Sequence, residues 1–157
     1  MVIGVRIATE TLNAIAAETN ASPAFEVCGL LLGVDGSITS HRVARNVAED
    51  PARAFEIDPA TLLAAYREER GGGLSILGCY HSHPTGRPEP AARDAADAAP
   101  NGWLWLIAAG GRVALWRAVR NGPVHGRFEP VPFACLSVAA PSRSDEVKED
   151  ADDRQPG

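Results

Sequence analysis

Hydrophobic residues recur along the chain with two different periods. Over residues 11–20 they are spaced as on one face of an α-helix, and Thr9 is placed to cap its first turn. A second helix is predicted to begin at Pro59, capped by Asp58, and to run through ATLLAAYREER before three glycines end it. Residues 91–99 have the composition of a third, short helix.

Other segments alternate between apolar and polar residues or are continuously apolar, and these are predicted to be strands. They are Val2–Ile7, Val27–Val34, Ser37–Val47, Leu74–His83, Trp103–Ala109 and Val113–Val119, with a last extended stretch that ends near Val138. Glycine-containing turns at 35–36 and 110–111 join two pairs of them into hairpins. Strands therefore outnumber helices, which predicts an α/β (α+β) fold with a mixed, mostly antiparallel β-sheet flanked by helices.

The composition is typical of one soluble globular domain. Of the 157 residues, 45% are hydrophobic and 22% are charged, and no apolar run is long enough to cross a bilayer. The N-terminus lacks the pattern of a signal peptide, so a cytoplasmic location is expected. The three cysteines are an odd number without a secretion signal, which argues against a disulfide framework. They form no CxxC pair, which argues against a thiolate zinc site.

The net charge of −5 is concentrated at the end of the chain. Residues 144–157 hold six acids against Lys148 and Arg154, a balance of −4, which leaves −1 for the rest. We therefore expect a folded domain over residues 1–138 and an acidic, disordered tail over residues 139–157, with residues 144–157 dispensable for folding. Without a basic stripe, a nucleic-acid partner is not expected.

The segment Tyr80-His81-Ser82-His83-Pro84 carries the candidate chemistry. Residues two apart on a strand point to the same face, so His81 and His83 are predicted to project together while Ser82 faces away. Asp94, in the first turn of the next predicted helix, can add a carboxylate. Two imidazoles and one carboxylate leave a fourth tetrahedral position open, as in a catalytic zinc site.

Such a site also needs a base, and Glu26 is the candidate, because a carboxylate at the head of a buried strand needs a reason to be there. Each signal alone has an ordinary explanation. His81 and His83 fit two partly exposed strand histidines, Asp94 fits an acid stabilised by a helix N-terminus, and Glu26 fits a solvated strand edge. The joint pattern is what favours a metal site.

The joint pattern also resembles that of a known family. It runs Glu26-x-Cys28-Gly29-Leu30-Leu31-Leu32-Gly33, then Asn46, then Phe55-x-Ile57-Asp58-Pro59, then Gly78-x-Tyr80-His81-Ser82-His83-Pro84 and Asp94. Over about residues 5–120 this is similar to the JAB/MPN/Mov34 (JAMM) zinc metalloproteases, especially their small stand-alone bacterial members. The resemblance implies an MPN/JAB-like, cytidine-deaminase-like single domain with a mixed sheet around a zinc site.

By position, the resemblance makes His81, His83 and Asp94 the Zn²⁺ ligands and Glu26 the general acid/base. Members of the family cleave isopeptide or peptide bonds after the C-terminal glycine of ubiquitin or ubiquitin-like proteins. Bacterial relatives process sulfur-carrier proteins of ubiquitin-like fold, or remove ubiquitin-like proteins from conjugates. The implied partner is therefore a ubiquitin-like or sulfur-carrier protein with a C-terminal Gly.

Position 91 departs from the family pattern. The family has a serine three residues before the aspartate, thought to hydrogen-bond the oxyanion, and this chain has Ala91. Losing such a donor typically costs about 10²–10³ in turnover. Ser82 faces away from the histidines, which leaves Thr85 and Arg87 in the following loop as substitutes.

Three functions are compatible with the pattern to different degrees. A zinc isopeptidase or peptidase is favoured by retention of all three ligands and Glu26. A catalytically weak or inactive MPN-type scaffold is the alternative, which Ala91 mildly favours. A DNA-repair-associated relative of the RadC type is disfavoured by the lack of a basic surface and by the HSHP form of the motif. The sequence leaves the substrate, the leaving group and the oligomeric state open.

Overall fold

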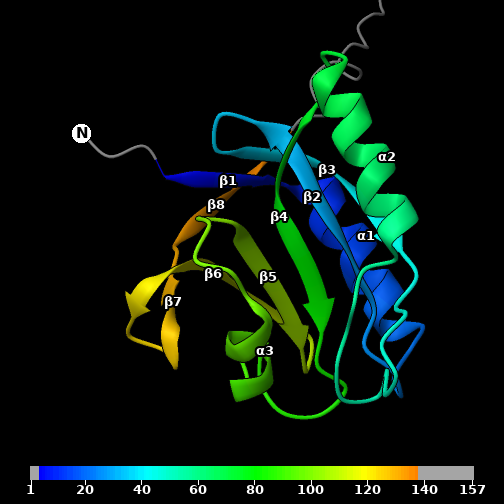
Figure 1. The fold of residues 1–157 in the computed structure, drawn as a ribbon, viewed down its shortest axis with the longest axis vertical. Helices are drawn as coiled ribbons and strands as arrows, with labels where there is room; N and C mark the ends of the chain where they lie inside the picture. The colour runs from blue at the N-terminus through cyan, green and yellow to red at the C-terminus, as the bar shows by residue number, and fades with distance from the viewer. Residues whose placement is uncertain (1–3, 138–157) are drawn as a thin grey trace, which may run out of the picture.

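The computed structural model of the chain describes residues 4–137 (Figure 1). The first two residues of the predicted strand Val2–Ile7, the boundary at residue 138 and the expected tail over 139–157 lie outside this range. No helix among the described residues has the length and apolar character that a membrane span requires.

Eight strands and three helices form the described part of the chain. The strands are β1 (Val5–Ala8), β2 (Cys28–Val34), β3 (Ser37–Ala44), β4 (Ser75–Ser82), β5 (Leu104–Ala109), β6 (Arg112–Gly122), β7 (Gly126–Pro130) and β8 (Phe133–Leu136). The helices are α1 (Thr9–Asn20), α2 (Pro59–Arg70) and α3 (Ala92–Asp97). All strands belong to one sheet in the order β7-β6-β5-β4-β2-β3-β1-β8.

The sheet is mixed, as predicted. Four neighbouring pairs are antiparallel (β2·β3, β2·β4, β5·β6 and β6·β7), and three are parallel (β1·β3, β1·β8 and β4·β5). The parallel pair β4·β5 needs a crossover, which the loop after β4 and helix α3 provide. This crossover carries the chain away from the carboxyl end of β4, where the candidate histidines lie.

The sheet is also strongly curled. Strands β7 and β8 are at opposite ends of the strand order, yet Val131 and Pro132 alone separate them. Across seven strand spacings of ~4.8 Å the edges of a flat sheet would lie about 33 Å apart, whereas the three peptide units from Pro130 to Phe133 reach about 11 Å at most. The edges must therefore approach one another, and Figure 1 shows β8 leaving β7 directly for β1.

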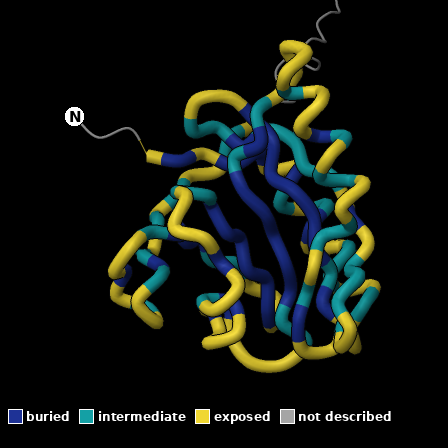
Figure 2. The backbone as a smooth tube through the Cα atoms, viewed as in Figure 1, coloured by how far each residue is buried: buried dark blue, intermediate teal, exposed yellow. Residues whose placement is uncertain are grey.

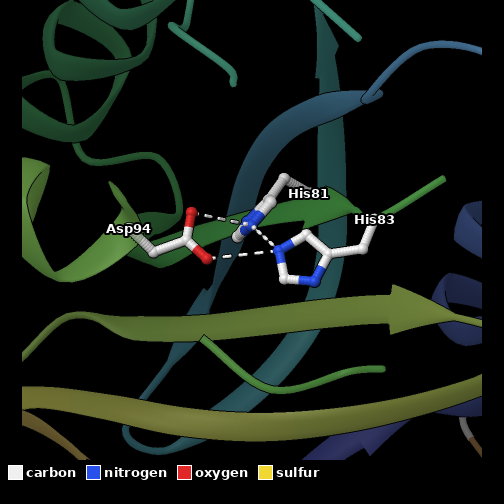
Figure 3. Close-up of side chains that lie close together, drawn as sticks. All are labelled: His81, His83 and Asp94. Carbon is white, nitrogen blue, oxygen red and sulfur yellow. Dashed lines mark hydrogen bonds and ion pairs between the residues drawn. The ribbon is translucent and has the colours of Figure 1, made fainter. Parts of the chain in front are cut away.

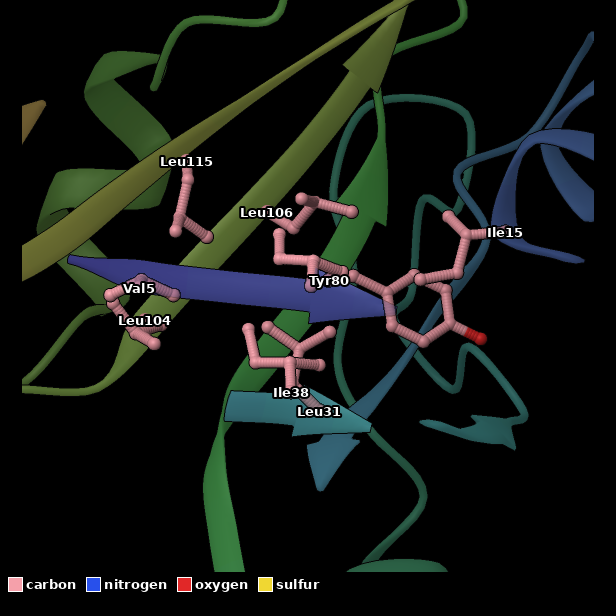
Figure 4. Close-up of a cluster of buried hydrophobic side chains, with 9 residues drawn as sticks. Val5, Ile15, Leu31, Ile38, Tyr80, Leu104, Leu106 and Leu115 are labelled. Carbon is pink, nitrogen blue, oxygen red and sulfur yellow. The ribbon is translucent and has the colours of Figure 1, made fainter. Parts of the chain in front are cut away.

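The two faces of the sheet bury separate hydrophobic clusters. On one face, Ile15 of α1 joins a cluster of buried residues from the six strands β1–β6, including Leu31, Tyr80 and Leu106 (Figure 4). On the other, α2 and α3 cover clusters that include Ala65 and Trp105. The central strands are consequently buried along their length, while the loops at their ends are exposed (Figure 2).

One local expectation was wrong. Thr9 is not a cap: it is the first residue of α1, and Ala8 at the cap position forms no side-chain hydrogen bond, because the chain passes directly from β1 into the helix. The last extended stretch is two strands, β7 and β8. The cap at Asp58 is confirmed, since its carboxylate accepts a hydrogen bond from the Ala60 N–H at 3.1 Å.

Candidate active site

Three side chains converge just beyond the carboxyl end of β4 (Figure 3). His81 and His83 point the same way, with their Nε2 atoms 3.1 Å apart. Asp94 is the third residue of α3. Its Oδ1 lies 3.2 Å from His81 Nε2, and its Oδ2 lies 3.2 Å from His83 Nε2. The two-residue period of a strand predicted that the two histidines would point the same way. The crossover after β4 then brings Asp94 back to them.

The spacing of these atoms fits a tetrahedral metal ion. Ligand bonds of about 2.0–2.1 Å around zinc place neighbouring ligand atoms about 3.3 Å apart. The two Nε2 atoms are 3.1 Å apart, and each lies 3.2 Å from a different oxygen of Asp94, distances close to that value. These residues form a candidate metal site among the described residues.

The far side of each imidazole has a different environment. His83 Nδ1 lies 2.9 Å from the Arg87 carbonyl oxygen, which can only accept, so Nδ1 carries the proton and Nε2 is free for a metal. The His81 ring is fully buried and stacks on Phe55 at 4.2 Å and 18° between planes. No group among the described residues hydrogen-bonds its Nδ1.

Burial and ion pairing shift the pKa values of all three groups. Burial lowers the pKa of His81, against the opposing effect of Asp94, which keeps this imidazole neutral. Burial alone would also lower the pKa of His83, but hydrogen bonds to Asp94 and to the Arg87 carbonyl raise it overall. Burial would raise the pKa of Asp94, yet the two imidazoles outweigh it and hold this carboxyl ionised. A neutral imidazole and a carboxylate are the forms that bind metal.

The loop between β4 and α3 is anchored from β6 and the turn before β7. Trp116 Nε1 donates to the Pro88 carbonyl oxygen at 3.0 Å, and His125 Nε2 lies 3.1 Å from that of Pro90. The Ala91 N–H then donates to the Asp94 carboxylate at 2.8 Å. These contacts fix the orientation of the carboxylate before any ligand is present.

Glu26 lies on the same cavity as His83 and Asp94, two residues before β2. Its side chain is 6% exposed, and no group among the described residues hydrogen-bonds its buried Oε1. Burial raises the pKa of Glu26 to about 7, with a smaller increase from Asp94 and opposing effects of His83 and Arg93. A carboxyl group with an unpaired buried oxygen, on a residue that lines a cavity beside a candidate metal site, is suited to bind a water or to take up a proton.

Comparison with known proteins identifies the family. A family model described as prokaryotic homologs of the JAB domain matches residues 8–122. The chain belongs to this family.

Characterised relatives of this JAB domain match part of it. It is 36% identical over 87 residues to a desampylase of Haloferax volcanii, covering 54% of this chain and 63% of the relative. It is 43% identical over 53 residues to a probable TtuB-protein conjugate cleaving protease of Thermus thermophilus, covering 34% and 36%. Both matches span less than two thirds of the relative's length.

A solved structure supports the fold. A JAB1/MPN domain protein from Archaeoglobus fulgidus superposes with a TM-score of 0.56 over 85% of this chain and 98% of its own, at 14% identity. The predicted fold class, an α+β JAB/MPN-like single domain with a mixed sheet, is therefore confirmed.

The cavity beside the candidate metal site has a volume of about 220 Å³. The sequence predicted some of the residues in its wall. The cavity is lined by Glu26, Ala52, Arg53, His83, Pro84, Thr85, Ala91 and Asp94. Thr85 was foreseen as a donor near position 91, whereas the side chain of Arg87 does not line the cavity. Arg53 was missed, and Phe55, although part of the family pattern, was given no place behind His81, because both lie in a segment predicted only as a loop.

Proposed function

We propose that this JAB domain is a zinc-dependent isopeptidase or peptidase that cleaves after the C-terminal glycine of a ubiquitin-like or sulfur-carrier protein. The observation that carries the proposal is the convergence of His81, His83 and Asp94 beside a cavity that is lined by two of them, His83 and Asp94, and by Glu26. The names of the relatives, a desampylase and a TtuB-conjugate cleaving protease, support the substrate class. A cytoplasmic location is part of the proposal.

His81, His83 and Asp94 would hold the zinc ion through Nε2, Nε2 and a carboxylate oxygen. When bound, zinc would act as a Lewis acid on the scissile carbonyl and lower the pKa of a water at its open position. The Arg87 carbonyl and the Ala91 N–H keep the His83 ring and the Asp94 carboxylate oriented for this task.

Glu26 would carry the proton. Its carboxylate would accept a proton from the attacking water and would then donate that proton to the leaving amine. Burial in the cavity wall raises the pKa of this carboxyl to about 7, so it can both take and release a proton near neutral pH. Cleavage of an amide needs both steps.

The experiment is cleavage of a linear fusion, in which a ubiquitin-like protein ending in Gly precedes a reporter. Glu26→Gln should reduce kcat by at least about 10²-fold, because the amide cannot accept the proton. Zinc content should stay near one ion per chain, because Glu26 is not a ligand. Glu10→Gln, an exposed acid on α1, is the matched control and should leave kcat unchanged.

Two results would contradict the proposal. Unimpaired turnover by Glu26→Gln would place the base elsewhere. A wild-type protein that binds zinc and cleaves neither linear nor lysine-linked fusions would favour the scaffold function, for which the missing donor at Ala91 is the supporting observation.

A further inference from the structure

The side chain of Asn46, just after β3, uses its whole hydrogen-bonding capacity on the main chain around the site. Its Nδ2 donates to the carbonyl oxygens of Glu26 at 2.9 Å and Ala54 at 3.0 Å. Its Oδ1 accepts from the N–H groups of Ala48 at 3.0 Å and Glu56 at 3.1 Å. An amide side chain has two donor hydrogens and two acceptor positions, and all four are engaged here.

The partners of Asn46 are the neighbours of two site residues. One donor hydrogen holds the main chain of Glu26 itself. Ala54 and Glu56 flank Phe55, whose ring stacks on the metal-site histidine His81. The Asn46 side chain therefore holds both the segment that carries Glu26 and the segment whose Phe55 ring packs against His81.

Glu26 depends on this segment because it lies outside any strand. Its N–H donates to the Pro51 carbonyl oxygen at 2.8 Å, and its carbonyl accepts from Asn46. Both of its main-chain groups are thus bonded to residues 46–51, and the contacts to β4 begin only at Val27, which pairs with Ser82. A loosened loop would let the Glu26 carboxyl drift, and a misplacement of about 1 Å costs up to about 10²-fold in rate.

We propose that Asn46 is a positioning residue that holds the Glu26 carboxyl and the Phe55 ring at their places beside His81. The proposal rests on the proposed function, in which Glu26 moves the proton. Asn46 does not line the cavity, so it acts through its neighbours and does not touch the substrate. Its loss should therefore lower kcat and leave KM within about twofold.

Two substitutions separate the donors of Asn46 from its acceptor. Asn46→Ala removes all four bonds. Asn46→Asp keeps an oxygen for the N–H groups of Ala48 and Glu56 but turns a second oxygen toward the Glu26 and Ala54 carbonyls, which it repels. Both variants should lose about 10- to 100-fold in kcat at full zinc occupancy. Asn46→Gln, which retains the amide one methylene further out, should recover part of the loss.

The matched control is Asn101→Ala. Asn101 also accepts a main-chain hydrogen bond, from the Trp103 N–H at 3.0 Å, but in a turn that makes no contact with the cavity wall. Melting temperatures give the structural cost of each variant, and kinetics are measured well below the lowest of them, per folded and zinc-loaded protein. A purely structural role would lower the melting temperature of the Asn46 variants and leave their kcat at the wild-type value, which would overturn the proposal.

Amide hydrogen exchange tests, without any substrate, whether Asn46 holds the main chain at Glu26 and Glu56. In Asn46→Ala the N–H groups of Glu26 and Glu56 should exchange faster than in the wild type, while Asn101→Ala should leave both unchanged. Unchanged exchange at Glu26 would also overturn the proposal. If the wild-type protein cleaves no fusion, the proposed function fails on its own, and the exchange measurement still shows whether Asn46 holds Glu26.

Discussion

At position 91 the cavity wall presents a methyl group where a hydrogen-bond donor could meet the developing oxyanion. Ala91 is also the cap residue of α3, and no side-chain cap bond is formed there. A serine hydroxyl at this position could accept the helix N–H of Asp94 and donate its own proton into the cavity.

Ala91→Ser is therefore expected to change two measurable quantities. The new cap should stabilise the fold by about 0.5–2 kcal/mol, seen as a higher melting temperature. The new donor should raise kcat on an amide-linked ubiquitin-like substrate by about tenfold or more at unchanged zinc content. Steady-state kinetics and thermal melting of both proteins test this.

Ala92→Ser, one residue further along and outside the cavity wall, is the control and should leave kcat unchanged. Equal kcat values for wild type and Ala91→Ser, with chemistry rate-limiting, would mean that a donor is already present. Arg53 and Thr85 are then the next residues to substitute, because they are the lining side chains outside the ligand set that can donate a hydrogen bond.

At the residue scale, the sequence predicted side chains whose placement follows from a local period. His81 and His83 share a face because a strand repeats every two residues. The places of Arg53 and Phe55 beside the site could not be predicted, because they depend on the hydrogen bonds by which Asn46 joins this loop to Glu26.

Strand β4 shows how one element serves both faces of the sheet. His81 faces the site, whereas Tyr80 points into the opposite cluster and donates its O–H to Glu18 of α1 at 2.6 Å. The Tyr80 ring passes directly over Gly29 of β2, where a methyl group would collide with the ring and with the Arg42 carbonyl oxygen. The glycine is thus required by the packing of a neighbouring strand.

Gly29→Ala is accordingly expected to destabilise the fold by about 2–3 kcal/mol or more, because a main-chain oxygen cannot move without shifting a strand. Denaturant unfolding gives the free energy. Gly71→Ala is the control, since its added methyl would meet its neighbours at ordinary contact distances of 3.5 Å and beyond. A Gly29→Ala protein as stable as Gly71→Ala would show that Tyr80 is not fixed in this position.

At the element scale, strongly periodic segments with a turn or cap signal were predicted within a few residues. The helix from Pro59 and the hairpin of β5 and β6 are examples. The cap at Thr9 was wrong because a strand runs into α1 without a connecting turn, which local propensity does not report.

For the molecule as a whole, composition and element order predicted a mixed sheet but not its closure. The pairing of β8 with β1 joins residues about 130 positions apart, and it depends on the curl of the entire sheet. No local pattern encodes that pairing. The residues of the candidate metal site, by contrast, are close in the sequence: His83 follows β4, and Asp94 in α3 is 11 positions further on. Their spacing in the sequence could therefore predict them.

Because the candidate metal site joins β4 to α3, metal binding there should be visible in the stability of the whole domain. A ligand that binds only the folded state at 100-fold its Kd adds about 2.7 kcal/mol, and in a protein of this size ~1 kcal/mol raises Tm by about 2–4 °C. Zinc in that excess should raise the Tm of the EDTA-treated protein by about 5–10 °C.

His83→Ala should lose most of this shift. His41→Ala, which changes a histidine of β3 that packs against Tyr80 and is not part of the candidate metal site, should keep it even if its own Tm is lower. A zinc-induced shift of equal size in His83→Ala would show that the ion binds elsewhere on the chain.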